Sequence, residues 1–288
     1  MIDPELLDGL GTVLTAHLPG GPLDVATVRA LDERLRVDVP PAVAPRVVRV
    51  DGLALRLHGP VLTGDAACLL WIHGGGMFLG SAAADDAFCC DLAAALGVAV
   101  VAVDYRLAPE HPHPAPLRDC ATALRWCAAR SPRVVVVGGS AGGGLAAALC
   151  LLARDGDGPA IAAAHLYYPM LDDRTASTQD TPVWNQRLAD LAWASYLDGR
   201  PADALAAPAR AADLSGLPPS YVEVGDVDLF RDEDITYAQR LAAAGVAVRL
   251  VVVPGAVHAF EAIAPGAAVS REARERRLHA LAQDLQRW

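Results

Sequence analysis

The sequence contains no lysine, so all 24 of its strongly basic side chains are arginines. Without lysine there is no Schiff-base nucleophile, no P-loop lysine and no lysine general base. The 34 acidic side chains outnumber these arginines and give a net charge of −10. This balance argues against a nucleic-acid partner, because binding to phosphate depends on counterion release by basic side chains.

The six cysteines show no C-x-x-C pair and no zinc-binding spacing. Most have apolar neighbours in the sequence, which predicts buried free thiols in a reducing compartment. Asp3, Glu5 and Asp8 stand where the basic region of a signal peptide would be. We therefore expect a cytoplasmic protein; the oligomeric state, a homo-oligomer included, is left open.

Apolar residues make up 53% of the 288 residues, and the mean hydropathy of +0.28 is high. In the stretch 134–153 the only polar side chain is Ser140, so a hydropathy window would score it as a membrane span. Gly138, Gly139 and the glycines at 142–144 interrupt it, however. We predict a strand, a sharp turn and a helix from Leu145, and no membrane span.

Unbroken hydrophobic strands alternate with helices along most of the chain, which predicts an α/β fold with a parallel sheet covered on both faces. Two helices are expected in the first fifty residues, and 171–217 interrupts the alternation as a helical insertion. The expected strands are 47–50, 53–57, 67–72, 98–103, 134–137, 160–167, 221–224 and 247–253. The expected helices between and after them are 85–96, 117–129, 145–154, 235–244 and 271–288.

Reactive groups in open parallel sheets lie at the carboxyl ends of strands. Strand 134–137 ends in Gly-Gly-Ser-Ala-Gly, a G-x-S-x-G nucleophile elbow that would hold Ser140 in strained φ/ψ. The helix that follows points N–H groups at a developing oxyanion, and the amide of Ala141 is the natural first donor. A phosphate-binding glycine loop is the alternative, but neither G-x-G-x-x-G nor a P-loop lysine is present.

Strand 67–72 ends in His73 and three glycines, Gly74, Gly75 and Gly76. Consecutive glycines expose backbone N–H groups to a substrate oxygen, so this run would supply the other half of an oxyanion hole. We assign the side chain of His73 a structural role.

A nucleophilic serine needs a base and a residue that orients it. His258 follows the last strand and Ser140 in chain order, as in α/β hydrolases. Asp226 and Asp228 both precede His258, and the residues alone leave either as its partner. His111 and His113 resemble a metal-binding pair, but no carboxylate–histidine cluster accompanies them, so we expect no metal.

These motifs resemble the hormone-sensitive-lipase-like group of α/β-hydrolase esterases, the bacterial family IV carboxylesterases. The matching segments are HGGGMFLG at 73–80, DYRLAPEHPHPAPLRD at 104–119, GGSAGG at 138–143, DLFRDE at 228–233 and PGAVHAF at 254–260. The resemblance implies the α/β-hydrolase fold, with a mostly parallel sheet and a helical cap. It also implies a division into an N-terminal cap segment at 1–45, a core at 46–170 and 218–288, and a cap insertion at 171–217.

The resemblance further implies Ser140 as nucleophile, His258 as base and Asp228 as its orienter. It places the oxyanion hole at the amide of Ala141 and two of the three glycines, with Gly74 and Gly75 favoured over Gly76. The chain departs from the family at two positions. Gly139 replaces an acidic residue before the nucleophile, and Leu229 replaces a proline after the aspartate.

We therefore predict a serine carboxylesterase that cleaves small, short-chain esters through an acyl-enzyme, without a cofactor. Phe78, Trp184 and Trp193 are candidates for its apolar pocket. The same triad could instead serve an amide, a lactone, a formamide or an acyl acceptor other than water. The alternative outside the enzymes is a ligand-binding protein that has lost turnover through the change at Gly139.

Overall fold

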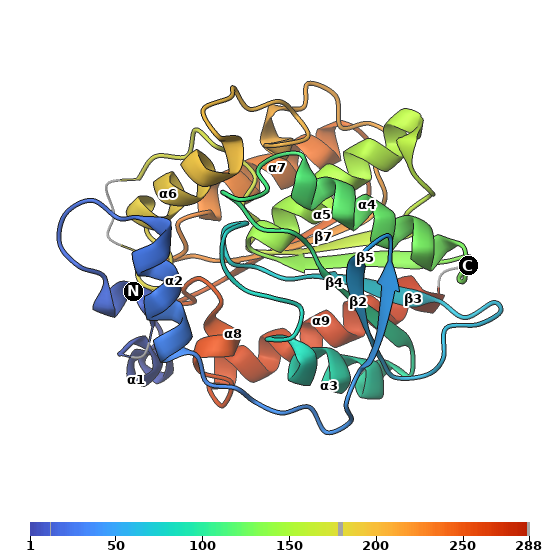
Figure 1. The fold of residues 1–288 in the computed structure, drawn as a ribbon, viewed down its shortest axis with the longest axis horizontal. Coiled ribbons are helices and arrows are strands. Elements are labelled where there is room, and N and C mark those ends of the chain that lie inside the picture. Colours follow the sequence, from blue (N-terminus) through green and yellow to red (C-terminus); the bar gives the residue numbers. More distant parts are fainter. Residues whose placement is uncertain (12, 178–180, 287–288) are drawn as a thin grey trace.

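A computed structural model describes residues 1–11, 13–177 and 181–286 of the chain, and its centre is a single sheet (Figure 1). The strands lie in the order β1-β2-β4-β3-β5-β6-β7-β8. Only the pairings of β1 with β2 and of β2 with β4 are antiparallel, so the sheet is mostly parallel, as predicted. The strands are β1 Arg46–Val50, β2 Leu53–His58, β3 Cys68–Ile72, β4 Ala99–Asp104, β5 Val134–Gly139, β6 Ala163–Tyr167, β7 Ser220–Gly225 and β8 Val248–Val253.

Helices cover both faces of the sheet (Figure 1). The helices α3 (Asp86–Leu96) and α9 (Ala268–Gln286) lie on one face. The helices α4 (Ala115–Ala128), α5 (Ala141–Leu152) and α7 (Arg231–Ala243) lie on the other. This arrangement confirms the α/β class expected from unbroken hydrophobic strands.

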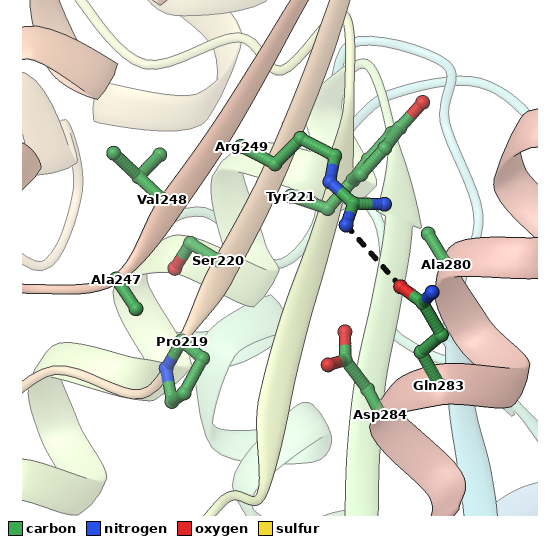
Figure 2. Close-up of a pocket in the computed structure, with 9 residues that line it drawn as sticks. All are labelled: Pro219, Ser220, Tyr221, Ala247, Val248, Arg249, Ala280, Gln283 and Asp284. Atoms are coloured by element: carbon green, nitrogen blue, oxygen red, sulfur yellow. Dashed lines mark hydrogen bonds between the residues drawn. The ribbon is translucent and has the colours of Figure 1, made fainter. Parts of the chain in front are cut away.

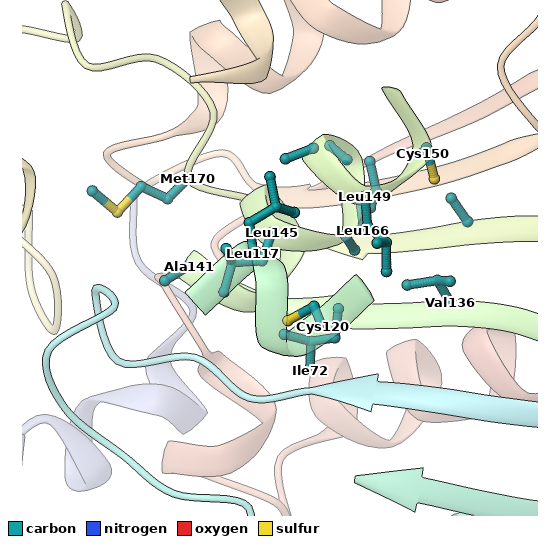
Figure 3. Close-up of a cluster of buried hydrophobic side chains, with 14 of the residues drawn as sticks. Ile72, Leu117, Cys120, Val136, Ala141, Leu145, Leu149, Cys150, Leu166 and Met170 are labelled. Atoms are coloured by element: carbon teal, nitrogen blue, oxygen red, sulfur yellow. The ribbon is translucent and has the colours of Figure 1, made fainter. Parts of the chain in front are cut away.

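Alternate side chains of each central strand enter different cores. Ile72, Val136 and Leu166 pack into the core beneath α4 and α5 (Figure 3). Their neighbours Trp71 and Val137 belong instead to the core beneath α3 and α9. Because both faces are buried, the period-two alternation of a half-exposed strand disappears from the sequence.

Several helices differ from the predicted ones, and α7, which was expected from residue 235, begins at Arg231. Helix α5 begins at Ala141, not at Leu145, so Gly142 and Gly144 lie inside it. A Cβ at Gly142 would stand 2.0 Å from the carbonyl oxygen of Ile72, and one at Gly144 would stand 2.2 Å from that of Met170. The close approach of this helix to the sheet therefore requires glycine, and it outweighs the low helix propensity of that residue.

The apolar repeat over residues 6–14, which predicts the first of the two N-terminal helices, is not one helix in the structure. It forms three short pieces, and glycines at 9 and 11 within the repeat favour this break. The pieces and the remaining helical segments are η1 Pro4–Leu6, α1 Leu7–Leu10, η2 Leu14–His17, α2 Val25–Leu35, η3 Ala153–Asp157, α6 Gln186–Leu197, η4 Pro208–Arg210 and α8 Phe260–Ile263.

The two segments expected to form a cap lie against each other, with α2 and α6 at the same end of the sheet (Figure 1). The amide of Val183 donates to Thr15 Oγ1 at 3.0 Å, and Arg187 donates to the carbonyl of Pro19 at 2.9 Å. Within the described part of the chain, no helix is both long and apolar enough to cross a bilayer.

Candidate active site

Ser140 occupies the sharp turn between β5 and α5. Its backbone has φ 56° and ψ −124°, the strained conformation predicted for an elbow serine. A Cβ at Gly138 would stand 2.3 Å from the carbonyl oxygen of Gly142, so a side chain there would prevent the turn from closing. The amide of Ser140 donates to the carbonyl of Tyr167 at 2.8 Å, which ties the elbow to the neighbouring strand.

The structure brings His258 and Asp228 to this serine from the ends of the last two strands. His258 Nε2 lies 2.9 Å from Ser140 Oγ, and His258 Nδ1 lies 2.8 Å from Asp228 Oδ2. All three side chains are buried. A carboxylate only accepts, so Nδ1 carries the imidazole proton and Nε2 is left to accept from the serine hydroxyl.

The other candidate orienter, Asp226, has a different partner. Its Oδ1 accepts a hydrogen bond of 2.7 Å from the amide of Gly255, in the loop that leads to His258. Asp228 is itself held by the amide of Phe230, which donates to Oδ1 at 3.0 Å. The structure thus favours Asp228 as the partner of the imidazole, and Asp226 holds the loop.

The glycine loop that follows β3 lies beside the elbow serine. A Cβ at Gly74 would stand 3.3 Å from the Cβ of Ser140, so this glycine lies directly against the elbow. Among the described residues, the amides of Gly74, Gly75, Gly76 and Ala141 have no backbone acceptor. They are available for an oxygen that carries negative charge above Ser140.

His73 supports the glycine loop. Its Nδ1 lies 2.8 Å from the carbonyl oxygen of Gly74, and its ring stacks on Tyr105 with centroids 4.1 Å apart. Tyr105 also donates from its hydroxyl to the carbonyl of His73 at 2.9 Å. Burial lowers the pKa of His73 to about 4, so this imidazole is neutral at physiological pH.

The three aromatic pocket candidates are Phe78, Trp184 and Trp193, and only the first two pack on each other. The Trp184 ring lies 6.1 Å from that of His258, and a Cβ at Gly76 would stand 2.7 Å from it. Phe78 is fully buried and packs on Trp184 with centroids 6.3 Å apart. Trp193 packs instead against Tyr196, a neighbour on α6. Trp184 therefore covers the glycine loop and the imidazole.

Two cavities lie outside the immediate surroundings of Ser140. A groove of about 150 Å³ at the amino ends of β7 and β8 contains a hydrogen bond of 3.2 Å from Arg249 to Gln283 (Figure 2). A cavity of about 340 Å³ adjoins Asp228 and is lined largely by polar groups, among them Thr175, Arg231 and Glu233. The three aromatic candidates line neither of them.

The structure does not bring the paired histidines into a metal site. His113 contacts the hydroxyl of Tyr196 at 3.1 Å. Over the described ranges, no group of three or more histidine, cysteine or acidic side chains has a geometry that could hold a metal ion.

Sequence reasoning missed three residues next to the triad: Tyr168, Glu261 and Arg277. The ring of Tyr168 packs edge-on against His258 with centroids 4.8 Å apart, and its hydroxyl donates to Glu261 at 2.5 Å. Arg277 pairs with the same carboxylate from α9. Glu261 follows His258 by three residues, and an acid so close in the chain to the candidate base was the signal available in the sequence.

The fold and the Ser140–His258–Asp228 geometry together define an α/β hydrolase, and residues 69–262 match the family described as "alpha/beta hydrolase fold". Esterase LipI of Mycobacterium tuberculosis is 36% identical, over 97% of this chain and 94% of its own. Carboxylesterase NlhH of the same organism is 34% identical, over 99% and 96%. A solved structure named bacterial heroin esterase superposes with a TM-score of 0.87 at 37% identity, over 99% of this chain and 98% of its own. The chain belongs to the hormone-sensitive-lipase-like carboxylesterases of bacterial family IV.

Proposed function

We propose that this ester-hydrolysing enzyme uses Ser140 as its nucleophile. The observation that carries the proposal is the continuous hydrogen-bonded path from Ser140 Oγ through the His258 ring to Asp228. His258 Nε2 takes the hydroxyl proton as Oγ attacks the ester carbonyl carbon, and it returns that proton to the leaving alcohol. Asp228 holds the ring in the tautomer that can accept the proton.

The carbonyl oxygen gains negative charge when the carbonyl carbon becomes tetrahedral. We infer that the amides of Ala141, Gly74 and Gly75 donate to this oxyanion and stabilise the transition state, because they have no backbone acceptor among the described residues and Gly74 lies against Ser140. The C–O bond to the alcohol then breaks and leaves an acyl-enzyme. Water, deprotonated by His258, releases the acid by the same route.

We further propose that the acyl group is short. Trp184 lies over the glycine loop and near His258, and the residue is buried. Little room remains beside the serine for a long chain while this ring stays in place. The residues 1–45 and 171–217 would act together as the cap that holds it, since they are joined by hydrogen bonds.

A cytoplasmic location is part of the same proposal. It is supported by the six cysteines, which are all free and buried.

The test is hydrolysis of p-nitrophenyl esters from acetate to decanoate by the wild-type chain and by Ser140→Ala. We expect the wild type to prefer acetate and butyrate. We expect Ser140→Ala to fall to about 10⁻³ of the wild-type rate or lower, since its nucleophile is gone. More than about 1% residual activity in the variant would contradict the mechanism.

The same panel should include an amide, a lactone and a formamide, because the triad chemistry does not by itself restrict the acyl donor. An acyl acceptor other than water would appear as transfer product when an alcohol is added. A wild-type chain that binds an ester but turns over none of these substrates would instead favour a ligand-binding protein.

A further inference from the structure

A largely buried network of charged and phenolic groups lies beside the triad. Glu261 on α8 accepts from the hydroxyl of Tyr168 and pairs with Arg277. Arg277 also donates from Nε to Glu223 at 2.7 Å, and Tyr221 donates to the other oxygen of Glu223 at 2.6 Å. The network therefore extends from the ring that touches His258 to the side chains of β7 that face α9.

Tyr168 links this network to His258 and to the turn that holds Ser140. Its ring lies against His258, and its backbone follows Tyr167, whose carbonyl accepts from the amide of Ser140. The amide of Tyr168 donates to the carbonyl of Glu223 at 2.6 Å. Its φ of 38° is unfavourable for a residue with a side chain, so its position depends on the contacts that hold it.

Gly139 faces the same tyrosine. A Cβ at this position would stand 3.4 Å from the ring of Tyr168 and 3.5 Å from its hydroxyl, which is ordinary van der Waals contact. Any longer side chain at 139 would therefore enter the space beside the hydroxyl, where the carboxylate of Glu261 already lies.

The charges of the network are consistent with this arrangement. Burial raises the pKa of Glu261. The positive charge of Arg277 and the hydrogen bonds from Arg277 and Tyr168 lower this pKa by a larger amount, so the net shift is downward. Burial raises the pKa of Tyr168 well above its usual value. Tyr168 consequently remains a phenol with one proton, and that proton goes to a carboxylate.

We propose that Glu261, acting through Tyr168, positions the imidazole of His258 against Ser140 and provides the carboxylate that the elbow lacks at Gly139. Tyr168 and Glu261 are positioning residues, because neither reaches the reacting ester. The inference rests on the proposed function of Ser140. It assigns the support of the turn at Ser140 to the carboxylate of Glu261 on α8, which is not part of that turn.

The test is a double-mutant cycle of Gly139→Asp and Glu261→Gln, with kcat expressed per site that a fluorophosphonate can titrate. Alone, Gly139→Asp places a second carboxylate beside a hydroxyl that has only one proton, and we expect kcat to fall about tenfold. Glu261→Gln removes the charge that balances Arg277, and we expect a loss of about fivefold. In the double variant the new carboxylate takes the place of the old one, so kcat should recover to within about threefold of wild type.

Gly139→Ala is the steric control, since its Cβ fits, and it should change kcat by less than about twofold.

A second pair of variants removes one hydroxyl each from the same network. Tyr168→Phe should lower kcat about fivefold with KM unchanged, whereas Tyr221→Phe, which lies away from His258, should leave kcat within about twofold.

Multiplicative losses in the cycle would overturn the proposal, as would equal kcat values for Tyr168→Phe and Tyr221→Phe. Failure of the underlying function is distinguishable, because it would appear as hydrolysis that persists in Ser140→Ala. If only the positioning role is wrong, hydrolysis will still depend on Ser140, but Tyr168→Phe will leave kcat unchanged.

Discussion

Asp226 and Asp228 stand two residues apart after the same strand, yet they bond to different atoms. Asp228 Oδ2 lies 2.8 Å from the imidazole of His258, and Asp226 Oδ1 accepts from the amide of Gly255 at 2.7 Å. The first interaction selects the tautomer of the base, and the second only holds the loop. Substituting each by asparagine keeps the size of the side chain and separates these roles.

We expect Asp228→Asn to lower kcat about 10³- to 10⁴-fold, because an amide can donate to Nδ1 and so stabilise the wrong tautomer. The matched variant Asp226→Asn keeps an oxygen that can accept from Gly255, so its kcat should fall less than about fivefold. Steady-state kinetics on p-nitrophenyl butyrate measures both variants. Equal losses would mean that Asp228 is not the specific partner of the base.

The three residues of the proposed triad could be singled out because each is marked by a local feature of the sequence. Ser140 lies in a glycine elbow, and His258 and Asp228 follow buried strands. The choice between Asp226 and Asp228 depended on the family resemblance, since both have the same local surroundings. Tyr168, Glu261 and Arg277 could not be assigned, because their contacts join residues that are far apart in the chain.

Among the elements, α7 connects the loop of Asp228 to the start of the 171–217 segment. Its Glu233 accepts from the amides of Leu171 and Asp172 at 2.6 Å and 3.2 Å, and Thr175 donates to its other oxygen. Burial raises the pKa of Glu233 from 4.5 to about 8. In the folded chain this carboxyl therefore keeps its proton over a pH range in which the same carboxyl has lost it in the unfolded chain.

The sign of the resulting pH dependence follows from proton counting. Between about pH 4.5 and about pH 8 the folded state binds more protons at Glu233, so its stability falls as pH rises. We expect the free energy of unfolding to decrease between about pH 5 and about pH 8, and Glu233→Gln to reduce that decrease by about 1 kcal/mol or more. Urea titrations at a series of pH values measure this. The neighbouring exposed Asp232, changed to asparagine, should leave the slope in this range unaltered; an unaltered slope in Glu233→Gln would contradict the assignment.

The element boundaries show where local reasoning fails. The glycines at 142–144 predicted a late start for α5, but the structure needs them inside the helix for its approach to Ile72 and Met170. The N-terminal apolar repeat predicted one helix, and it is broken into short pieces. For α5, contacts with distant parts of the chain, which the sequence does not display, decide where the helix begins. For the N-terminal repeat, the glycines at 9 and 11 favour the break.

At the scale of the whole molecule, the parallel sheet was predictable because strands buried on both faces are hydrophobic without interruption. The packing of the two cap segments was not, since it depends on contacts such as Val183 with Thr15 and Arg187 with Pro19. The apolar stretch 134–153 becomes β5, the elbow and α5, whose residues from Ala141 to Leu151 are all buried. High mean hydropathy here reflects a doubly covered sheet.

The proposed mechanism requires Ser140 to be an activated nucleophile. The most direct measurement is the intact mass and peptide map of the chain after brief exposure to a fluorophosphonate, with Ser140→Ala as the control. Attack by Oγ on phosphorus expels fluoride, so we expect a single adduct on Ser140 in the wild type and none in the variant. Label on another residue, or an unlabelled chain that still hydrolyses esters, would contradict it.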